Sequence, residues 1–102
     1  MLNIKTKEFN FGTINYGQIG AHLIEIENPT PSSIVVDSTT SCGCTTGHML
    51  KNPIEPYKTE TFKVNFNTKK TGLGSQSKSI TIKWNVGSKV YSETVKFTVN
   101  VV

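Results

Sequence analysis

The feature that most constrains the fold of this sequence is a short-range alternation of apolar and polar residues. It is clearest in Phe62–Phe66, Ile80–Trp84 and Val95–Val101, where every second residue is apolar. A period of two places one apolar face inward and one polar face outward, as in a half-buried β-strand. No window of the sequence carries an apolar stripe at helical spacing. The pattern therefore predicts an all-β chain.

Turn residues separate these runs. Asn28–Pro31, Thr71–Gly74 and Val86–Ser88 are rich in glycine, proline and small polar residues, which favour tight turns. The 102 residues match the size of one domain. We therefore predict that residues 1–102 form a single antiparallel β-sandwich of about seven strands. The short turn at Gly87 should join Ile80–Asn85 and Val90–Val101 into a hairpin.

The inward faces of these runs define the expected core. Trp84 is in phase with its apolar neighbours and is expected to be a core residue, and His22 is expected to be half-buried at a strand end. The predicted core consists of Phe9, Phe11, Ile24, Ile26, Ile34, Val36, Phe62, Val64, Phe66, Ile80, Ile82, Trp84, Val95, Phe97 and Val99.

The charge pattern excludes several kinds of partner. The chain carries eleven lysines, no arginine and a net charge of +4. The lysines are dispersed, with Lys69–Lys70 the only adjacent pair, so no basic stripe for nucleic acid is present. The longest apolar run, Ile34–Val36, is far too short to cross a membrane. We expect neither nucleic-acid binding nor membrane insertion.

The two cysteines, Cys42 and Cys44, flank Gly43 close to His48 and Met49. As thiolates, together with His48 and Met49, they would offer soft ligands for Cu(I) or Zn. As a Cys-x-Cys disulfide, they would close a strained and easily reduced ring. As free thiols, one or both would pack as small apolar side chains. We expect free thiols and no bound metal, because free cysteine is commonly buried and nothing nearby completes a site.

The sequence predicts no catalytic residues. A thiol nucleophile needs a base and a third group that orients the base. His48 follows Cys44, but no acid lies near them and Asp37 is the only aspartate. Gly72–Gly74 lacks the lysine and helix of a phosphate-binding loop. We expect no enzyme activity, no cofactor and no small-molecule substrate.

Several motifs occur in a fixed order along the chain: Phe9–Ile14, Ser41-Cys42-Gly43-Cys44-Thr45, Pro53-Ile54-Glu55-Pro56, Phe62–Asn67 and Lys70-Thr71-Gly72. In this order they resemble a bacterial family of immunoglobulin-like domains of unknown function, over residues 8–100. The resemblance implies an immunoglobulin-like sandwich similar to sperm-protein and pilus-chaperone domains, and it implies no known activity. Tyr57 stands where the family usually has a turn glycine, so we expect a differently shaped turn there.

These observations favour a non-enzymatic accessory protein that binds the surface of a protein assembly. We expect a phage virion component, assembled in the host cytoplasm, with capsid or tail proteins as partners. The use of lysine and never arginine, together with many asparagine and threonine residues, indicates an AT-rich coding sequence. The chain starts at its first strand without a signal peptide. The alternative is a periplasmic or cell-surface protein, its signal removed, whose Cys-Gly-Cys loop binds metal or acts in redox chemistry.

Two surfaces are expected to make the contact with that assembly. The long C-terminal strand, Val90–Val102, ends without a charged tail and is expected to be an edge that adds to a partner strand. The polar segment Thr39–His48 is the second candidate, as an adaptable loop.

Overall fold

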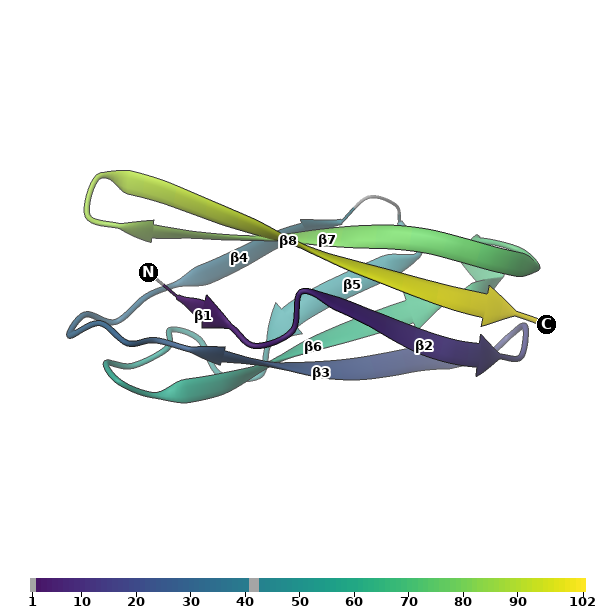
Figure 1. The fold of residues 1–102 in the computed structure, drawn as a ribbon, viewed down its shortest axis with the longest axis horizontal. Coiled ribbons are helices and arrows are strands. Elements are labelled where there is room, and N and C mark those ends of the chain that lie inside the picture. Colours follow the sequence, from purple (N-terminus) through teal and green to yellow (C-terminus); the bar gives the residue numbers. More distant parts are fainter. Residues whose placement is uncertain (1, 41–42) are drawn as a thin grey trace.

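Two four-stranded sheets pack face to face in the computed structural model, which describes residues 2–40 and 43–102 (Figure 1). The β3–β6 sheet has the order β1 (Asn3–Ile4), β3 (Ile19–Glu27), β6 (Thr59–Asn67), β5 (Thr45–Met49). The β7–β8 sheet has the order β2 (Glu8–Ile14), β8 (Lys89–Val101), β7 (Gly74–Val86), β4 (Val36–Thr40). The predicted all-β, immunoglobulin-like sandwich is confirmed.

The predicted C-terminal hairpin is present and is longer than expected. Strands β7 and β8 pair antiparallel from Val86↔Lys89 to Gly74↔Val101. Gly87 adopts the left-handed backbone conformation, with φ 61°, that the tight turn between them requires. This ribbon runs along the long direction of a molecule measuring 45 × 21 × 17 Å (Figure 1).

One strand pair is parallel rather than antiparallel. After β1 the chain changes sheets, and β2 pairs with the C-terminal half of β8 in parallel. The register shifts between Asn10 and Thr13, where Gly12 has φ 78° and its amide donates to Asn10 Oδ1 at 2.7 Å. This bulge bends β2 along the side of the sandwich where it faces β3.

The core lies between the sheets, as the alternation predicted. Every residue of the predicted core is buried except Phe9 and Phe11, which are half-buried. His22 is half-buried, as predicted, with its ring stacked on Phe9 at 4.0 Å, but it lies within β3 and not at a strand end. The core further includes Val101, the last apolar residue of the Val95–Val101 run, and Leu2, Ile4, Cys44, Met49 and Ile54, which the alternation did not single out.

A buried asparagine holds the loops at one end of the sandwich. Asn28 has no exposed surface, and its Nδ2 donates to the carbonyls of Ser32, Ile54 and Glu55 at 2.8, 3.0 and 3.2 Å. Its Oδ1 accepts from the amide of Thr30 at 3.0 Å. Buried polar groups are stable when paired in this way.

The turn at Tyr57 differs from expectation. We expected a changed shape where tyrosine replaces glycine, but Tyr57 has φ 59°, the left-handed conformation that glycine adopts freely. Its side chain points into solvent and is 68% exposed. The backbone therefore keeps a glycine-like conformation in spite of the side chain.

The helical content of the described residues is a single turn, the 3-10 helix Thr68–Lys70. No helix there has the length and apolar character needed to cross a bilayer.

Candidate functional site

The cysteine segment lies where the chain crosses from β4 to β5. Gly43 and Cys44 form a turn before β5, while Cys42 lies outside the described residues. Cys44 is buried and disulfide-bonded, and its Sγ is 3.5 Å from Thr45 Oγ1. The prediction of free thiols is therefore wrong for Cys44. The sequence could not distinguish a free cysteine from a disulfide-bonded one at this position, because both forms of the side chain are commonly buried.

The structure does not bring the candidate metal ligands together. His48 lies on the solvent face of β5, opposite Lys63. Met49 is buried opposite Phe62, because neighbouring residues of a strand point to opposite faces. In the described part of the chain, no three His, Cys, Asp or Glu residues are placed to hold a metal ion. The absence of a metal in the native protein stays a prediction.

The segment Thr39–His48 is also not a single adaptable loop. Its described ends belong to β4 and β5, which lie at the same side of the two sheets. Ser38 Oγ donates to the carbonyl of Gly47 at 3.1 Å and so ties these two strands together.

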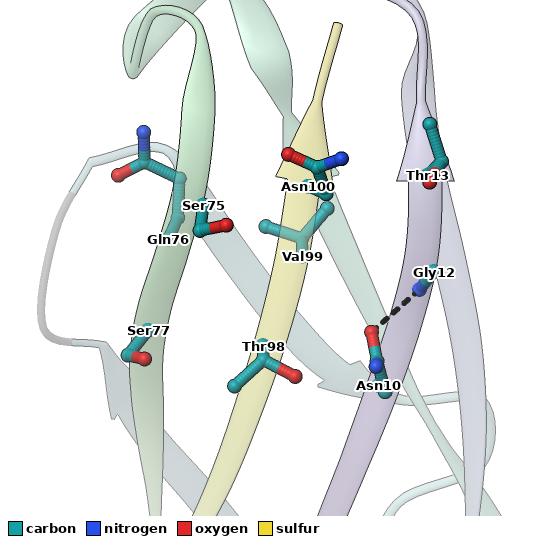
Figure 2. A pocket seen from close by; sticks show the side chains of 9 residues that line it. All are labelled: Asn10, Gly12, Thr13, Ser75, Gln76, Ser77, Thr98, Val99 and Asn100. Carbon is teal, nitrogen blue, oxygen red and sulfur yellow. Dashed lines mark hydrogen bonds between the residues drawn. The ribbon is translucent and has the colours of Figure 1, made fainter.

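A shallow polar hollow lies on the outer face of the β7–β8 sheet, where β2 and the C-terminal end of β8 lie beside the start of β7 (Figure 2). Two rows of side chains cross the strands there, because register places Ser77 and Asn10 on either side of Thr98, and Ser75 and Thr13 on either side of Asn100. All six are uncharged hydroxyl or amide side chains. Such groups can donate and accept hydrogen bonds, but they supply neither a general base nor a nucleophile activated by one.

The C-terminal strand is not the edge that the sequence led us to expect. Strand β8 lies in the interior of its sheet, between β2 and β7. Lys96–Val101 pairs with β2, and Val102 exchanges backbone hydrogen bonds with Ile14 and Tyr16 at 3.0 and 2.8 Å. The prediction of strand addition at Val90–Val102 is therefore wrong for the C-terminal half, because β2 crosses over from the other sheet to cover it.

Two other edges carry a side-chain cap or charged residues. On β4, the Asn52 side chain accepts from the Val36 amide at 3.1 Å and donates to the Val36 carbonyl at 2.9 Å. The uncovered N-terminal half of β8 carries Lys89 and Glu93, and Glu93 forms an ion pair with Lys7 at 2.6 Å. Charged and capped edges resist pairing with another chain.

The edge of β3 lacks such protection. Strand β1 pairs only with its C-terminal end, at Glu27 and Ile26, and no other described strand pairs with this edge between Ile19 and Leu23. Ile19 is 65% and Leu23 is 58% exposed, and Ala21 between them is also exposed. The three side chains form an apolar row on the outer face beside unpaired backbone.

This edge is a site that the sequence analysis missed. In Ile19–Leu23 the apolar residues Ile19, Ala21 and Leu23 lie on the outward face, whereas Gly20 and His22 lie on the inward face that leads to Ile24. Apolar residues on the outward face of a strand were the available signal. The alternation alone could not show that β2 leaves the edge of β3 open by joining the opposite sheet.

Solved structures share this fold at low sequence identity. A PapD-like domain of human CEP192 aligns with a TM-score of 0.83 and 10% identity, over 99% of this chain and 84% of that one. A Porphyromonas gingivalis W83 protein of unknown function aligns with a TM-score of 0.80 and 17% identity, over 97% and 46% of the two chains. The YadV chaperone aligns with a TM-score of 0.73 and 12% identity, over 98% and 51%.

These likenesses establish the fold alone. The chain spans about half the length of the Porphyromonas gingivalis protein and of YadV. No curated protein matches the sequence. A family model described as a protein of unknown function, DUF1573, matches residues 2–101, which is nearly the whole chain. The chain therefore belongs to the DUF1573 family.

Proposed function

We propose that this chain is a non-enzymatic interaction domain that binds a protein partner by strand addition. The observation that carries the proposal is the open β3 edge, where unpaired backbone lies beside exposed Ile19, Ala21 and Leu23. An extended segment that adds to such an edge gains main-chain hydrogen bonds, and the apolar row contributes side-chain contacts. The YadV chaperone has the same fold, which agrees with a role in binding protein.

A single charge on the apolar row tests this function. Leu23→Lys adds a charge beside the edge, and it should preserve folding because Leu23 is largely exposed. Ser92→Lys, at an exposed position on β8, is the matched control. Wild type and Ser92→Lys should retain the same partner from a lysate of the source organism, and Leu23→Lys should lose it. A partner that binds the wild type and both variants equally would contradict the assignment to this edge.

Membership of a phage virion is our finer proposal for the biological setting. It is supported by the presence of lysine and absence of arginine in the chain, which indicate an AT-rich coding sequence, a bias shared by many bacterial viruses. Purified particles should contain the protein in stoichiometric amounts, and its removal should leave particles that lack a surface component. Particles from which the protein is absent would refute this setting.

The disulfide at Cys44 favours residence outside the reducing cytosol. This supports a second setting, the periplasm or cell surface of a bacterium, with the same interaction role. Alkylation of protein denatured in acid-quenched cells distinguishes the two, because denaturation exposes the buried Cys44. In a periplasmic protein Cys44 should resist alkylation from the time of export, whereas in a virion protein it should be alkylated when the cells are quenched before lysis. Recovery of the protein in the cytosolic fraction, with its cysteines fully reduced, would exclude the periplasmic setting.

A further inference from the structure

We propose that the open edge of β3 joins two copies of this chain, so that the β3–β6 sheet continues from one copy into the other. The inference rests on the proposed function and identifies the partner at that site as a second copy. It follows from the direction of the backbone, the symmetry of the apolar row and the charges at its ends.

The backbone of β3 presents alternate residues to the open edge. On the β1 side, the amide of Lys5 donates to the carbonyl of Glu25 at 3.0 Å. In an antiparallel strand the amide and carbonyl of one residue point to the same side, and successive residues alternate. Ile19, Ala21 and Leu23 lie six, four and two positions before Glu25 in the sequence, which are even steps along the strand. Their amides and carbonyls therefore face the open edge, and their side chains share the outer face.

These three residues are complementary to themselves. An antiparallel pairing centred on Ala21 places Ala21 opposite Ala21 of the second copy, and Ile19 opposite Leu23 in both directions. Each of the three pairs can exchange two backbone hydrogen bonds, and every side-chain pair is apolar on both sides. This is the arrangement that a two-fold interface requires, because the same patch serves both copies.

The charges at the two ends of the row are complementary. The same register brings Glu25 near Gly17 of the second copy. A Cβ at Gly17 would lie 3.8 Å from Lys69 Cε, so a positive charge is close to that turn. No charged residue lies between Ile19 and Leu23. Lys5 lies at the same end and forms an ion pair with Glu27 of its own copy at 3.5 Å. Glu25 is therefore the charge that meets Lys69, and pairing brings opposite charges together at both ends, although each copy carries a net charge of +4.

The inner side of the edge is already filled, which limits the contact to the backbone and the outer row. A Cβ at Gly20 would lie 2.6 Å from Ile14 Cδ1 and 3.2 Å from Phe11 Cδ1, so β2 packs directly against this part of β3. Lys5 occupies the edge at Glu25 and ends the pairing there. A contact of this size should produce a weak, concentration-dependent dimer.

Cysteine pairs test the register. Paired residues in such a ladder have Cα atoms about 5.5 Å apart, within the range that a disulfide spans. Under mild oxidation Ala21→Cys should form covalent dimers by itself. Ile19→Cys and Leu23→Cys should crosslink when mixed and only weakly alone, and Ser92→Cys should give the background level. An Ala21→Cys chain that crosslinks no more than Ser92→Cys, or an Ile19→Cys chain that crosslinks alone as well as the mixture does, would overturn the pairing.

Sedimentation of the intact chain tests the dimer without cysteines. Wild type should dimerise as its concentration rises, and Leu23→Lys should weaken the dimer about tenfold. Glu25→Lys should also weaken it, and the double change Glu25→Lys with Lys69→Glu should restore it. Circular dichroism of each variant should match wild type, because these positions are exposed.

The outcomes separate this inference from the proposed function. A wild-type chain that stays monomeric at every concentration would refute the dimer. If Leu23→Lys then still abolishes binding of a different protein, the interaction role stands without self-association. A dimer that Leu23→Lys disrupts, with no other protein bound at this edge, would confirm the second copy as the partner.

Discussion

At the scale of single residues, Gly47 shows how closely the sheets approach. Its position on β5 faces the core, where an added Cβ would overlap Ile80 Cδ1 and lie 2.6 Å from Phe62 Cζ. Gly47→Ala should therefore lower the free energy of unfolding by about 1–3 kcal/mol, measured by urea denaturation. Gly43→Ala is the control, because nothing lies within 4 Å of its added methyl. Equal stability of the two variants would contradict this packing.

Tyr57 provides a prediction of the opposite sign. Its left-handed backbone, φ 59°, disfavours any side chain, and the exposed ring gains little from packing. Tyr57→Gly should stabilise the protein by about 0.5–1 kcal/mol, seen as a higher melting temperature. Tyr16→Gly, at another exposed turn tyrosine without a left-handed backbone, should be slightly destabilising. A destabilised Tyr57→Gly variant would show that the ring makes a contact that matters.

At the scale of elements, the position of β8 changes what its truncation should do. Deleting Val99–Val102 removes two buried side chains, Val99 and Val101, and much of the pairing with β2. We expect a loss of about 3–6 kcal/mol in the free energy of unfolding, measured in urea. Deleting the exposed Val102 alone should cost far less. A truncated chain with wild-type stability that loses only partner binding would restore β8 as a binding edge.

At the scale of elements, the sequence also predicted most of the strands but only one pair of neighbours, the C-terminal hairpin of β7 and β8. The runs around Val64, Ile82 and Phe97 have a clear period of two, so the burial of these residues followed directly. Met49 and Ile54 lie in segments with glycine, proline or isolated apolar residues, and their burial depends on what packs above them. Periodicity reports which face of a strand is apolar and carries no information about which strand lies beside it.

At the scale of the whole molecule, the decisive event is the change of sheets between β1 and β2. It places β2 beside β8, which buries the C-terminal edge and leaves the edge of β3 open from Ile19 to Leu23. One crossover thus covers the edge that we expected to bind a partner and leaves another edge uncovered. The two edges differ in accessibility because of topology, since both contain apolar residues.

The all-β class, the inward faces of the main strands and the C-terminal hairpin could be predicted from local patterns in the chain. Each of these depends on the alternation of side chains along a strand or on a tight turn, which are local properties of the chain. The free edge, the opposite directions of His48 and Met49, and the oxidation of Cys44 became visible only in the folded molecule. The free edge above all depends on contacts between residues far apart in the chain, such as Phe9 with Phe97, and these contacts leave no periodic trace in the sequence.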